Sequence, residues 1–380
     1  MKLTIMTPAM FSILTLTFMT VLDAEIEIPE LKKDTFNSSQ KCGVCHKAIF
    51  SYWSRSSHAL SYSDPVFDLA YLKAYRQTAG EAKKFCLRCH APTVLITEDY
   101  DTEMDLTREG VTCDFCHSVQ ALKQEGEGLW YKLNIGGVKF GPFMDTESKI
   151  HDTKRVDFLT TSEFCAGCHE LRGENGVPII STYSEWKESP QKREGIQCQD
   201  CHMPVGEEYI VAPELKETKK RINLHDVSGR HHSQLEKAAR IEIDEIKKFG
   251  DKRTVLIGVT NSGSGHKIPT GTPSRVLILK VRVLDQNGQV IYTREEVFKK
   301  TLIDSEGNIL VDDTDLLLKA DKVYQDNRIL PGETRYITVS FEADKNKQVV
   351  IDARLLYKYR VKIEDYEEIL VEMASDVRTM

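Results

Sequence analysis

The spacing of apolar and polar residues changes character near residue 238. Beyond it, apolar residues alternate with polar ones in short runs, which is the pattern of half-buried β-strands. Turn sequences such as "DQNGQ" and "DSEGN" separate these runs. The runs span residues 239–246, 254–261, 275–285, 289–298, 335–343 and 349–361. Six or seven such strands predict an antiparallel β-sandwich of the immunoglobulin-like type over residues 236–380.

Residues 25–235 lack a long regular period and predict short helices joined by loops. One stretch, "LWYKLNIGGVKFGPF" at residues 129–143, partly alternates and contains a glycine pair, so it predicts a small hairpin. The whole pattern indicates an α+β multidomain protein, with a mainly helical and loop-rich domain followed by the β-sandwich. The length of 380 residues is ample for two domains.

The first 24 residues resemble a secretory signal peptide. One lysine precedes an apolar run that ends near the small residue Ala24. The alternative is a retained membrane anchor, but Pro8 and several threonines weaken the run as a permanent helix. We therefore expect an exported protein, in the periplasm or at the cell surface. The net charge of −7 and the lack of a basic run give no support to nucleic-acid binding.

The ten cysteines all fall in C-x-x-C pairs, and each pair is followed at once by a histidine. Ten cysteines in an exported protein would ordinarily suggest five disulfides. A zinc site would need four ligands and no histidine fixed after each pair. Redox C-x-x-C motifs occur singly. The five motifs, called the first to the fifth below, are Cys42, Cys45, His46; Cys86, Cys89, His90; Cys113, Cys116, His117; Cys165, Cys168, His169; and Cys198, Cys201, His202.

C-x-x-C-H is the attachment motif of c-type haem. On one helical turn, residues i, i+3 and i+4 share a face, so two thiols can bond to the haem while the histidine reaches the iron beside them. The motif therefore predicts five covalently attached haem c groups, with the motif histidines as proximal ligands.

The other axial position of each iron decides what the site can do. A second histidine closes the iron and gives an electron carrier, whereas an open position permits small-ligand chemistry. Of eleven histidines, six lie outside the motifs and are candidate distal ligands: His58, His151, His225, His231, His232 and His266. Because His231 and His232 are adjacent, they point in opposite directions in an extended segment, and at most one should bind a given iron. The simplest count is five irons, each held by two histidines.

His58 and His266 carry the most specific expectations. If the helix of the first motif continued to His58, the two side chains would lie about 18 Å apart along the axis. His58 would then serve a neighbouring haem rather than that of His46. His266 lies in the loop "NSGSGHKIPTG", whose glycines would let the backbone approach a flat cofactor and whose Pro269 would stiffen the chain. It could reach from the second domain to a haem in the first.

The residues resemble multihaem cytochromes c of the c552/c554 type. The resemblance covers most of residues 41–275 and rests on "CGVCHKAIFSYWSRSSHA", "GVTCDFCHSV", "KFGPFMDTESKIH", "TSEFCAGCHE", "YSEWKESP", "CQDCHMP" and "VTNSGSGHKIPTGTPSR". It implies distal ligands at His58, His151 and His266, and electron transfer along closely stacked haems. Some members retain a five-coordinate haem, and some form extracellular filaments. The type member has four haems, whereas this chain has five motifs.

Three functions fit these observations. The first is an electron carrier without a catalytic site, which exchanges electrons with a quinol-oxidising membrane complex, other cytochromes or a terminal reductase of anaerobic respiration. The second is an oxidoreductase that acts on a small nitrogen or sulfur compound at one open haem. The third is a subunit of a homo-oligomer, an extracellular filament or an outer-membrane conduit. We favour the first, and an enzymatic role stays open.

Overall fold

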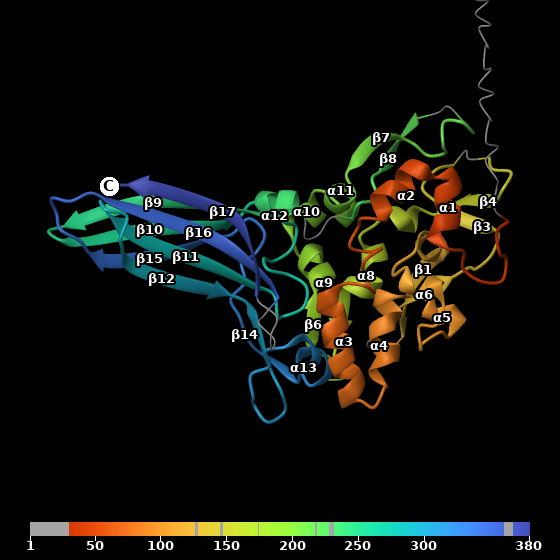
Figure 1. The fold of residues 1–380 in the computed structure, drawn as a ribbon, viewed down its shortest axis with the longest axis horizontal. Helices are drawn as coiled ribbons and strands as arrows, with labels where there is room; N and C mark the ends of the chain where they lie inside the picture. The colour runs from red at the N-terminus through yellow and green to blue at the C-terminus, as the bar shows by residue number, and fades with distance from the viewer. Residues whose placement is uncertain are drawn as a thin grey trace, which may run out of the picture.

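The computed structural model describes residues 30–125, 128–144, 147–173, 175–216, 219–227, 232–360 and 368–380. The predicted signal peptide lies outside these residues. A region of short helices occupies one end of the molecule and a β region the other (Figure 1). This arrangement confirms the α+β class, while the predicted boundary near residue 235 stays a prediction. None of the helices in the described part of the chain is long and apolar enough to cross a membrane.

The N-terminal region contains short helices and small two-stranded sheets. Its helices are α1 (Ser39–Cys45), α2 (Lys47–Trp53), α3 (Pro65–Gln77), α4 (Ala82–His90), α5 (Val94–Thr97), α6 (Asp105–Arg108), α7 (Cys113–Cys116), the 3₁₀ turn η1 (Asp157–Thr160), α8 (Glu163–His169), α9 (Thr182–Lys187), α10 (Pro190–Arg193), α11 (Cys198–His202) and α12 (His232–Ala238). Its strands are β1 (Val119–Glu125), β2 (Gly128–Leu133), β3 (Val138–Gly141), β4 (Asp152–Arg155), β5 (Glu170–Arg172), β6 (Pro178–Ser181), β7 (Val205–Tyr209) and β8 (Lys219–Asn223).

Side chains form only small cores in this region. Among its described residues, one cluster centres on Phe36, Phe115 and Val119. A second centres on Leu87, Ala91 and Val94. Helices this short gain little stability from their own hydrogen bonds. Stability in this region must therefore depend on other buried apolar surface, as expected where bound cofactors fill the interior.

The prediction of a hairpin at residues 129–143 is wrong. β2 pairs antiparallel with the preceding β1, and β3 pairs in parallel with the later β4. Gly136 has a φ of +137°, so the glycine pair turns the chain from one small sheet into another. Alternation identified extended backbone there, but it could not specify the partner strand.

The β region contains β9 (Ala239–Phe249), β10 (Lys252–Asn261), β11 (Val276–Asp285), β12 (Val290–Phe298), β13 (Lys300–Ile303), α13 (Asp313–Leu318), β14 (Lys322–Asp326), β15 (Thr334–Glu342), β16 (Val349–Arg360) and β17 (Ile369–Thr379). All six predicted strands are present. The strands β13, β14 and β17 were not predicted. One sheet has the order β15-β10-β9 and the other β12-β11-β16-β17, with every neighbouring pair antiparallel.

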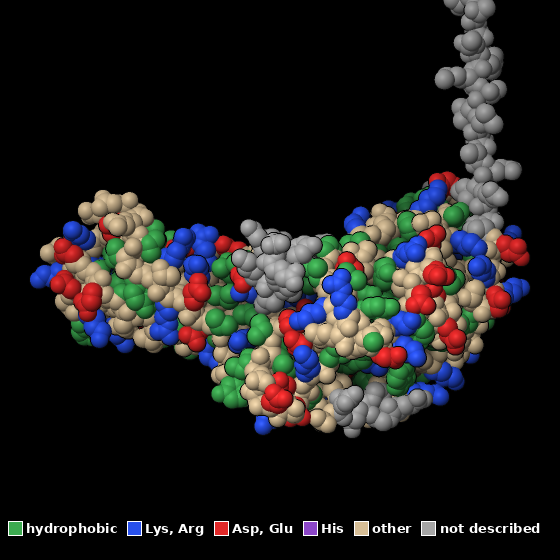
Figure 2. All heavy atoms as spheres, turned by 60° about the horizontal axis from the view of Figure 1, so that its bottom comes forward, with side chains coloured by type: hydrophobic (Ala, Val, Ile, Leu, Met, Phe, Trp, Pro, Cys, Tyr) green, Lys and Arg blue, Asp and Glu red, His purple; other side chains and the backbone are tan. Residues whose placement is uncertain are grey.

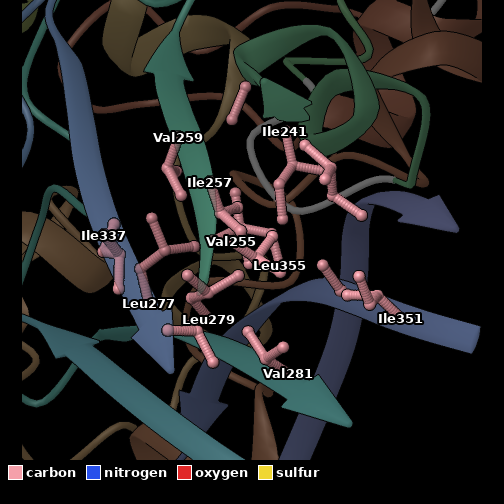
Figure 3. Packing of buried hydrophobic residues seen from close by; sticks show 14 of the residues in the cluster. Ile241, Val255, Ile257, Val259, Leu277, Leu279, Val281, Ile337, Ile351 and Leu355 are labelled. Atoms are coloured by element: carbon pink, nitrogen blue, oxygen red, sulfur yellow. The ribbon is translucent and has the colours of Figure 1, made fainter. Parts of the chain in front are cut away.

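A single hydrophobic core joins the two large sheets. Val255, Ile257 and Val259 of β10 lie against side chains of the other sheet such as Leu279 and Leu355 (Figure 3). All of these are almost completely buried. The alternation of β10 and β11 thus turns one face of each strand inward, so this region holds a conventional side-chain core.

The part of the β region formed by β13, α13 and β14 packs against the helical region. Helix α13 packs against α3, where Lys73 forms an ion pair with Asp312 at 2.8 Å and the Thr314 hydroxyl donates to the Ala70 carbonyl. On the face in Figure 2, basic and acidic side chains are intermixed over both regions. That face therefore presents a mixed field to an approaching partner.

Candidate haem-binding sites

Each of the five motifs lies on a short helix. The helices are α1, α4, α7, α8 and α11, and each motif histidine is either the last helical residue or the residue directly after it. Capping side chains mark the start of α1 and α7. The Ser38 hydroxyl accepts from the Gln40 amide, and the Thr112 hydroxyl accepts from the Phe115 amide. The helices therefore place both thiols and the imidazole of each motif close together, as the sequence predicted.

Four of the motif histidines lie opposite another histidine from a distant part of the chain. His151 is 6.3 Å from His46 between ring centres, and His58 is 6.4 Å from His169. The remaining two pairs are His117 with His225, at 6.3 Å, and His202 with His266, at 6.3 Å.

These separations fit two imidazoles that share one metal ion. An imidazole nitrogen lies about 1.1 Å from its ring centre and roughly 2.0–2.1 Å from a bound transition metal. Two rings on opposite sides of one ion therefore have centres about 6.3 Å apart. Face-to-face stacking brings ring centres much closer, as at Phe67 and His90, where they are 3.9 Å apart. The four pairs thus match the spacing that an iron with two axial histidines requires.

Hydrogen bonds at the second ring nitrogen orient several of these imidazoles. The Nδ1 atom of His46 lies 2.5 Å from the Ile210 carbonyl oxygen, and that of His117 lies 2.5 Å from the Phe140 carbonyl oxygen. Nδ1 of His225 lies 2.8 Å from the Asn223 carbonyl oxygen. A carbonyl can only accept, so it fixes the proton on Nδ1 and leaves Nε2 free as a metal ligand.

Burial keeps these imidazoles neutral. It lowers the pKa of His58 to about 3, and the pKa of His169, His225 and His266 to about 4. Burial also lowers the pKa of His46, His90 and His117. Only a neutral imidazole can bind a metal, so these groups are ready to act as ligands at physiological pH.

The position of His58 arises differently from the single helix considered above. The helix is interrupted at His46, which lies between α1 and α2, and α2 ends at Trp53. His58 follows in a series of turns, which bring it opposite His169 rather than His46. The expectation that His58 serves a neighbouring motif therefore agrees with its placement, although no continuous helix leads to it.

His90 differs from the other motif histidines. Its Nδ1 lies 2.9 Å from the Ser61 carbonyl oxygen, which leaves Nε2 free as at the other sites. Phe67 stacks on its ring, with 3.9 Å between centres. Within the described part of the chain, no histidine ring lies opposite it.

The two histidines that could complete the count are not described. His231 lies outside the described residues, and His232 begins α12 with a side chain that also lies outside them. Helix α12 contacts the fifth motif, because Gln234 Nε2 donates to the Cys201 carbonyl at 3.1 Å. That motif already has His266 opposite His202. Ligation by His231 or His232 stays a prediction.

The glycines of the loop around His266 have roles within the protein itself, while their approach to a flat cofactor stays a prediction. A side chain on Gly263 would overlap the Lys237 carbonyl at the end of α12, so this glycine allows close packing of protein backbone. Gly271 has a φ of +89°, which favours glycine. Extended backbone at Ile268 forms an isolated bridge with Ile329. The loop is held by the β region and directs His266 toward His202.

The five motifs form one contiguous cluster. Thiols of different motifs lie close enough to shift one another's pKa, namely Cys42 with Cys113, Cys89 with Cys168, and Cys165 with Cys198. Cys116 also lies close enough to Cys165 to help raise the pKa of the Cys165 thiol. The fourth motif therefore contacts the second, third and fifth, and the first contacts the third.

Sequence reasoning missed two buried groups that support the motifs. Asp114, inside the third motif, accepts hydrogen bonds from the backbone and side chain of Asn37 and forms an ion pair with Lys139. Tyr131 is buried beside the fourth motif and donates to the Phe164 carbonyl at 2.6 Å. Neither has a sequence signature of its own. Both support the motifs through contacts with distant segments, which form only in the folded chain.

The described side chains do not match the alternatives to haem. All ten cysteines are free thiols. Among the described residues, no group of three or more His, Cys, Asp and Glu side chains is arranged around a common metal position. Paired histidines suit an ion whose remaining ligands come from a porphyrin, rather than a zinc site that takes four ligands from the protein.

Comparisons with known proteins agree with this geometry. A family model described as "Cytochrome c554 and c-prime" matches residues 41–118. Among solved structures, the chain is similar to a penta-haem cytochrome c552 from Thermochromatium tepidum, with 22% identity and a TM-score of 0.73, over 92% of this chain and 100% of that one. A putative β-galactosidase from Bacteroides fragilis is 11% identical over 38% of this chain and 17% of that one, and its TM-score of 0.22 supports no argument. No curated protein matches the sequence.

In its fold, its repeated motifs and the family match at residues 41–118, the chain is similar to multihaem c-type cytochromes. Within that class, the chain resembles the cytochrome c552/c554 type, which confirms the resemblance seen in the sequence. The comparisons also support covalently bound haem c in this chain.

Proposed function

We propose that this protein is an exported electron-transfer cytochrome that carries five covalently attached haems. The observation that supports it most strongly is the set of four histidine pairs, with ring centres 6.3–6.4 Å apart, each anchored on a C-x-x-C-H helix. A pair of this kind closes both axial positions of an iron. A closed iron exchanges electrons and does not bind substrate.

In this proposal, the motif cysteines hold the haems and the paired histidines hold the irons. Bound haem supplies one-electron redox chemistry. The chain contributes neutral imidazoles, several of which are oriented at Nδ1 by backbone carbonyls. Cysteines of different motifs lie close to one another, so the haems that they would hold are neighbours, which is what an electron carrier with several centres requires.

The two large sheets contribute a rigid support. We infer an immunoglobulin-like sandwich, because the first, second and fifth long strands form one sheet while the third, fourth, sixth and seventh form the other. This unit would donate His266 to the fifth motif. Its partners would be redox proteins, namely a quinol-oxidising complex, other cytochromes or a terminal reductase. The third role considered above, assembly into oligomers or filaments, would use the outer surface of the two large sheets.

A second candidate function rests on His90. No histidine in the described residues faces it, so the iron at the second motif would have an open side if neither His231 nor His232 binds it. An open iron could bind a small nitrogen or sulfur compound. The single observation that favours this function is the difference between His90 and the four paired histidines.

Coulometric titration of the purified holoprotein tests the main proposal. We expect five one-electron equivalents for each polypeptide. In His151→Ala, the count should stay at five while one-fifth of the iron becomes high-spin, because His46 loses the residue opposite it. Lys149→Ala is the control, since its exposed side chain lies in the same segment and faces no motif. Fewer than five equivalents, or an unchanged spin state in His151→Ala, would contradict the proposal.

A further inference from the structure

A buried group of charges lies where the β region meets the helical region. Arg328 of the β region forms an ion pair with Glu185 of α9, with 2.7 Å between Nη1 and Oε1. Their side chains are only 4% and 5% exposed. Most ion pairs between protein regions lie in solvent and contribute little. A pair this deeply buried depends on both partners, because removing one leaves the other charge uncompensated.

Arg328 also holds the loop that carries His266. Its Nη1 donates to the Pro269 carbonyl at 3.2 Å, and its Nε and Nη2 bind both carboxylate oxygens of Asp326 at 2.8 Å. Burial by itself would lower the pKa of Arg328, but Asp326 and Glu185 outweigh burial and raise that pKa. The guanidinium is therefore a permanent positive charge close to His266.

Glu185 reaches the same loop from the helical side. Its Oε2 accepts a hydrogen bond from the Thr270 hydroxyl at 2.8 Å, and that hydroxyl also lies 2.9 Å from the Thr182 hydroxyl. Asn261 completes the support, because its side-chain amide donates to the His266 carbonyl at 2.8 Å. Both ends of the Arg328–Glu185 pair are thus connected to the segment that presents His266.

We propose that Arg328 and Glu185 are positioning residues for His266 and together set the reduction potential of the haem at the fifth motif. This inference rests on the proposed ligation of that haem by His202 and His266. Arg328 is among the charges that act on His266, and it lowers the pKa of that imidazole in addition to the larger effect of burial. Nothing in the motif itself supplies a comparable charge at this depth.

The two residues should act on the potential in opposite directions. Oxidised haem carries one more positive charge than reduced haem, so a nearby cation favours the reduced form and a nearby anion favours the oxidised form. Neutralising Arg328 should lower the potential, and neutralising Glu185 should raise it. A purely structural role predicts something else, because disturbing the loop from either side would weaken His266 in the same way.

The test is redox titration of the holoprotein followed by electron paramagnetic resonance. His266→Ala first identifies the haem concerned, as the one whose low-spin signal disappears. We expect Arg328→Gln to lower the potential of that haem and Glu185→Gln to raise it, with the other four unchanged. Arg328→Lys, which keeps the charge but not the planar fork, should give a potential between the wild type and Arg328→Gln. Arg354→Gln, in a solvent-exposed ion pair, is the control.

The results separate this inference from the proposed function. If His266→Ala leaves every low-spin signal intact, ligation by His266 is wrong and both proposals about this site fail. If His266→Ala removes one signal but both Gln variants leave its potential unchanged, or shift it in the same direction, only the inference about Arg328 and Glu185 is overturned. Should Arg328→Gln fail to fold, the near-isosteric Glu185→Gln still decides the matter, through an upward shift or its absence.

Discussion

At the scale of single residues, backbone contacts determine which nitrogen of each imidazole carries the proton and which stays free for the proposed iron. Burial lowers the pKa of His46, His117 and His225, and backbone carbonyls occupy Nδ1 of the same three residues. The same strategy applies at His90, which lacks a partner histidine in the described residues. The chemical difference between the sites therefore lies in what faces each imidazole, rather than in the imidazole itself.

Lys300 gives a pH-dependent prediction at this scale. Its Nζ donates to the Pro178 carbonyl at 2.7 Å, to the Ile179 carbonyl and to the Ser181 hydroxyl, and burial lowers its pKa to about 8. An unfolded lysine titrates near 10.4. Between these values the unfolded chain binds more protons, so the free energy of unfolding should rise with pH, by roughly 3 kcal/mol in total.

Denaturant unfolding between pH 7.5 and 10.5 measures this contribution. Lys300→Met should lack the rise, whereas Lys252→Met, at an exposed position of β10, should keep it. Equal pH profiles for the wild type and Lys300→Met would show that Lys300 titrates normally in the folded protein.

At the scale of elements, a short helix and its neighbour form each site. Helix α8 carries the fourth motif and packs against Tyr131 of β2, whose hydroxyl bonds the Phe164 carbonyl. A side chain on Gly167 would overlap the ring of Tyr131. The glycine within this motif is therefore required by the neighbouring strand rather than by the haem attachment pattern, which accepts any residue at that position.

Gly167→Ala tests this packing. We expect a loss of about 1–3 kcal/mol in the free energy of unfolding, because the methyl group must displace a buried ring. Gly137→Ala is the matched control, since nothing lies within 4 Å of the added carbon there. Denaturant unfolding of both holoproteins gives the comparison, and equal stability of the two variants would contradict the packing argument.

The sequence predicted the elements better than their partners. Motif spacing identified every haem-attachment helix, and alternation identified six strands. The edge strand β17 was not predicted, because several of its apolar side chains are exposed, among them Val377 at 54%. The hairpin at residues 129–143 failed because alternation does not specify a partner. The pairing of His58 with His169, like the Arg328–Glu185 contact, joins distant segments, and no local pattern reports such contacts.

At the scale of the whole molecule, each histidine pair joins segments far apart in the chain. His151 returns to the first motif, His225 to the third, and His266 connects the β region to the fifth. If these pairs bind iron as proposed, ligation and folding are coupled. The β region, with its own side-chain core, holds one ligand in place for a helical region whose described side chains form only small cores.

The electron paramagnetic resonance spectrum of the oxidised holoprotein tests the central claim most directly. The account predicts low-spin signals for at least four-fifths of the iron, from the four histidine pairs. A high-spin signal confined to one-fifth of the iron would favour the second candidate function at His90. A larger high-spin fraction would show that some pairs do not bind iron, and the account of the sites would fail. Low-spin signals from all the iron would contradict an open site at His90 and remove the second candidate function.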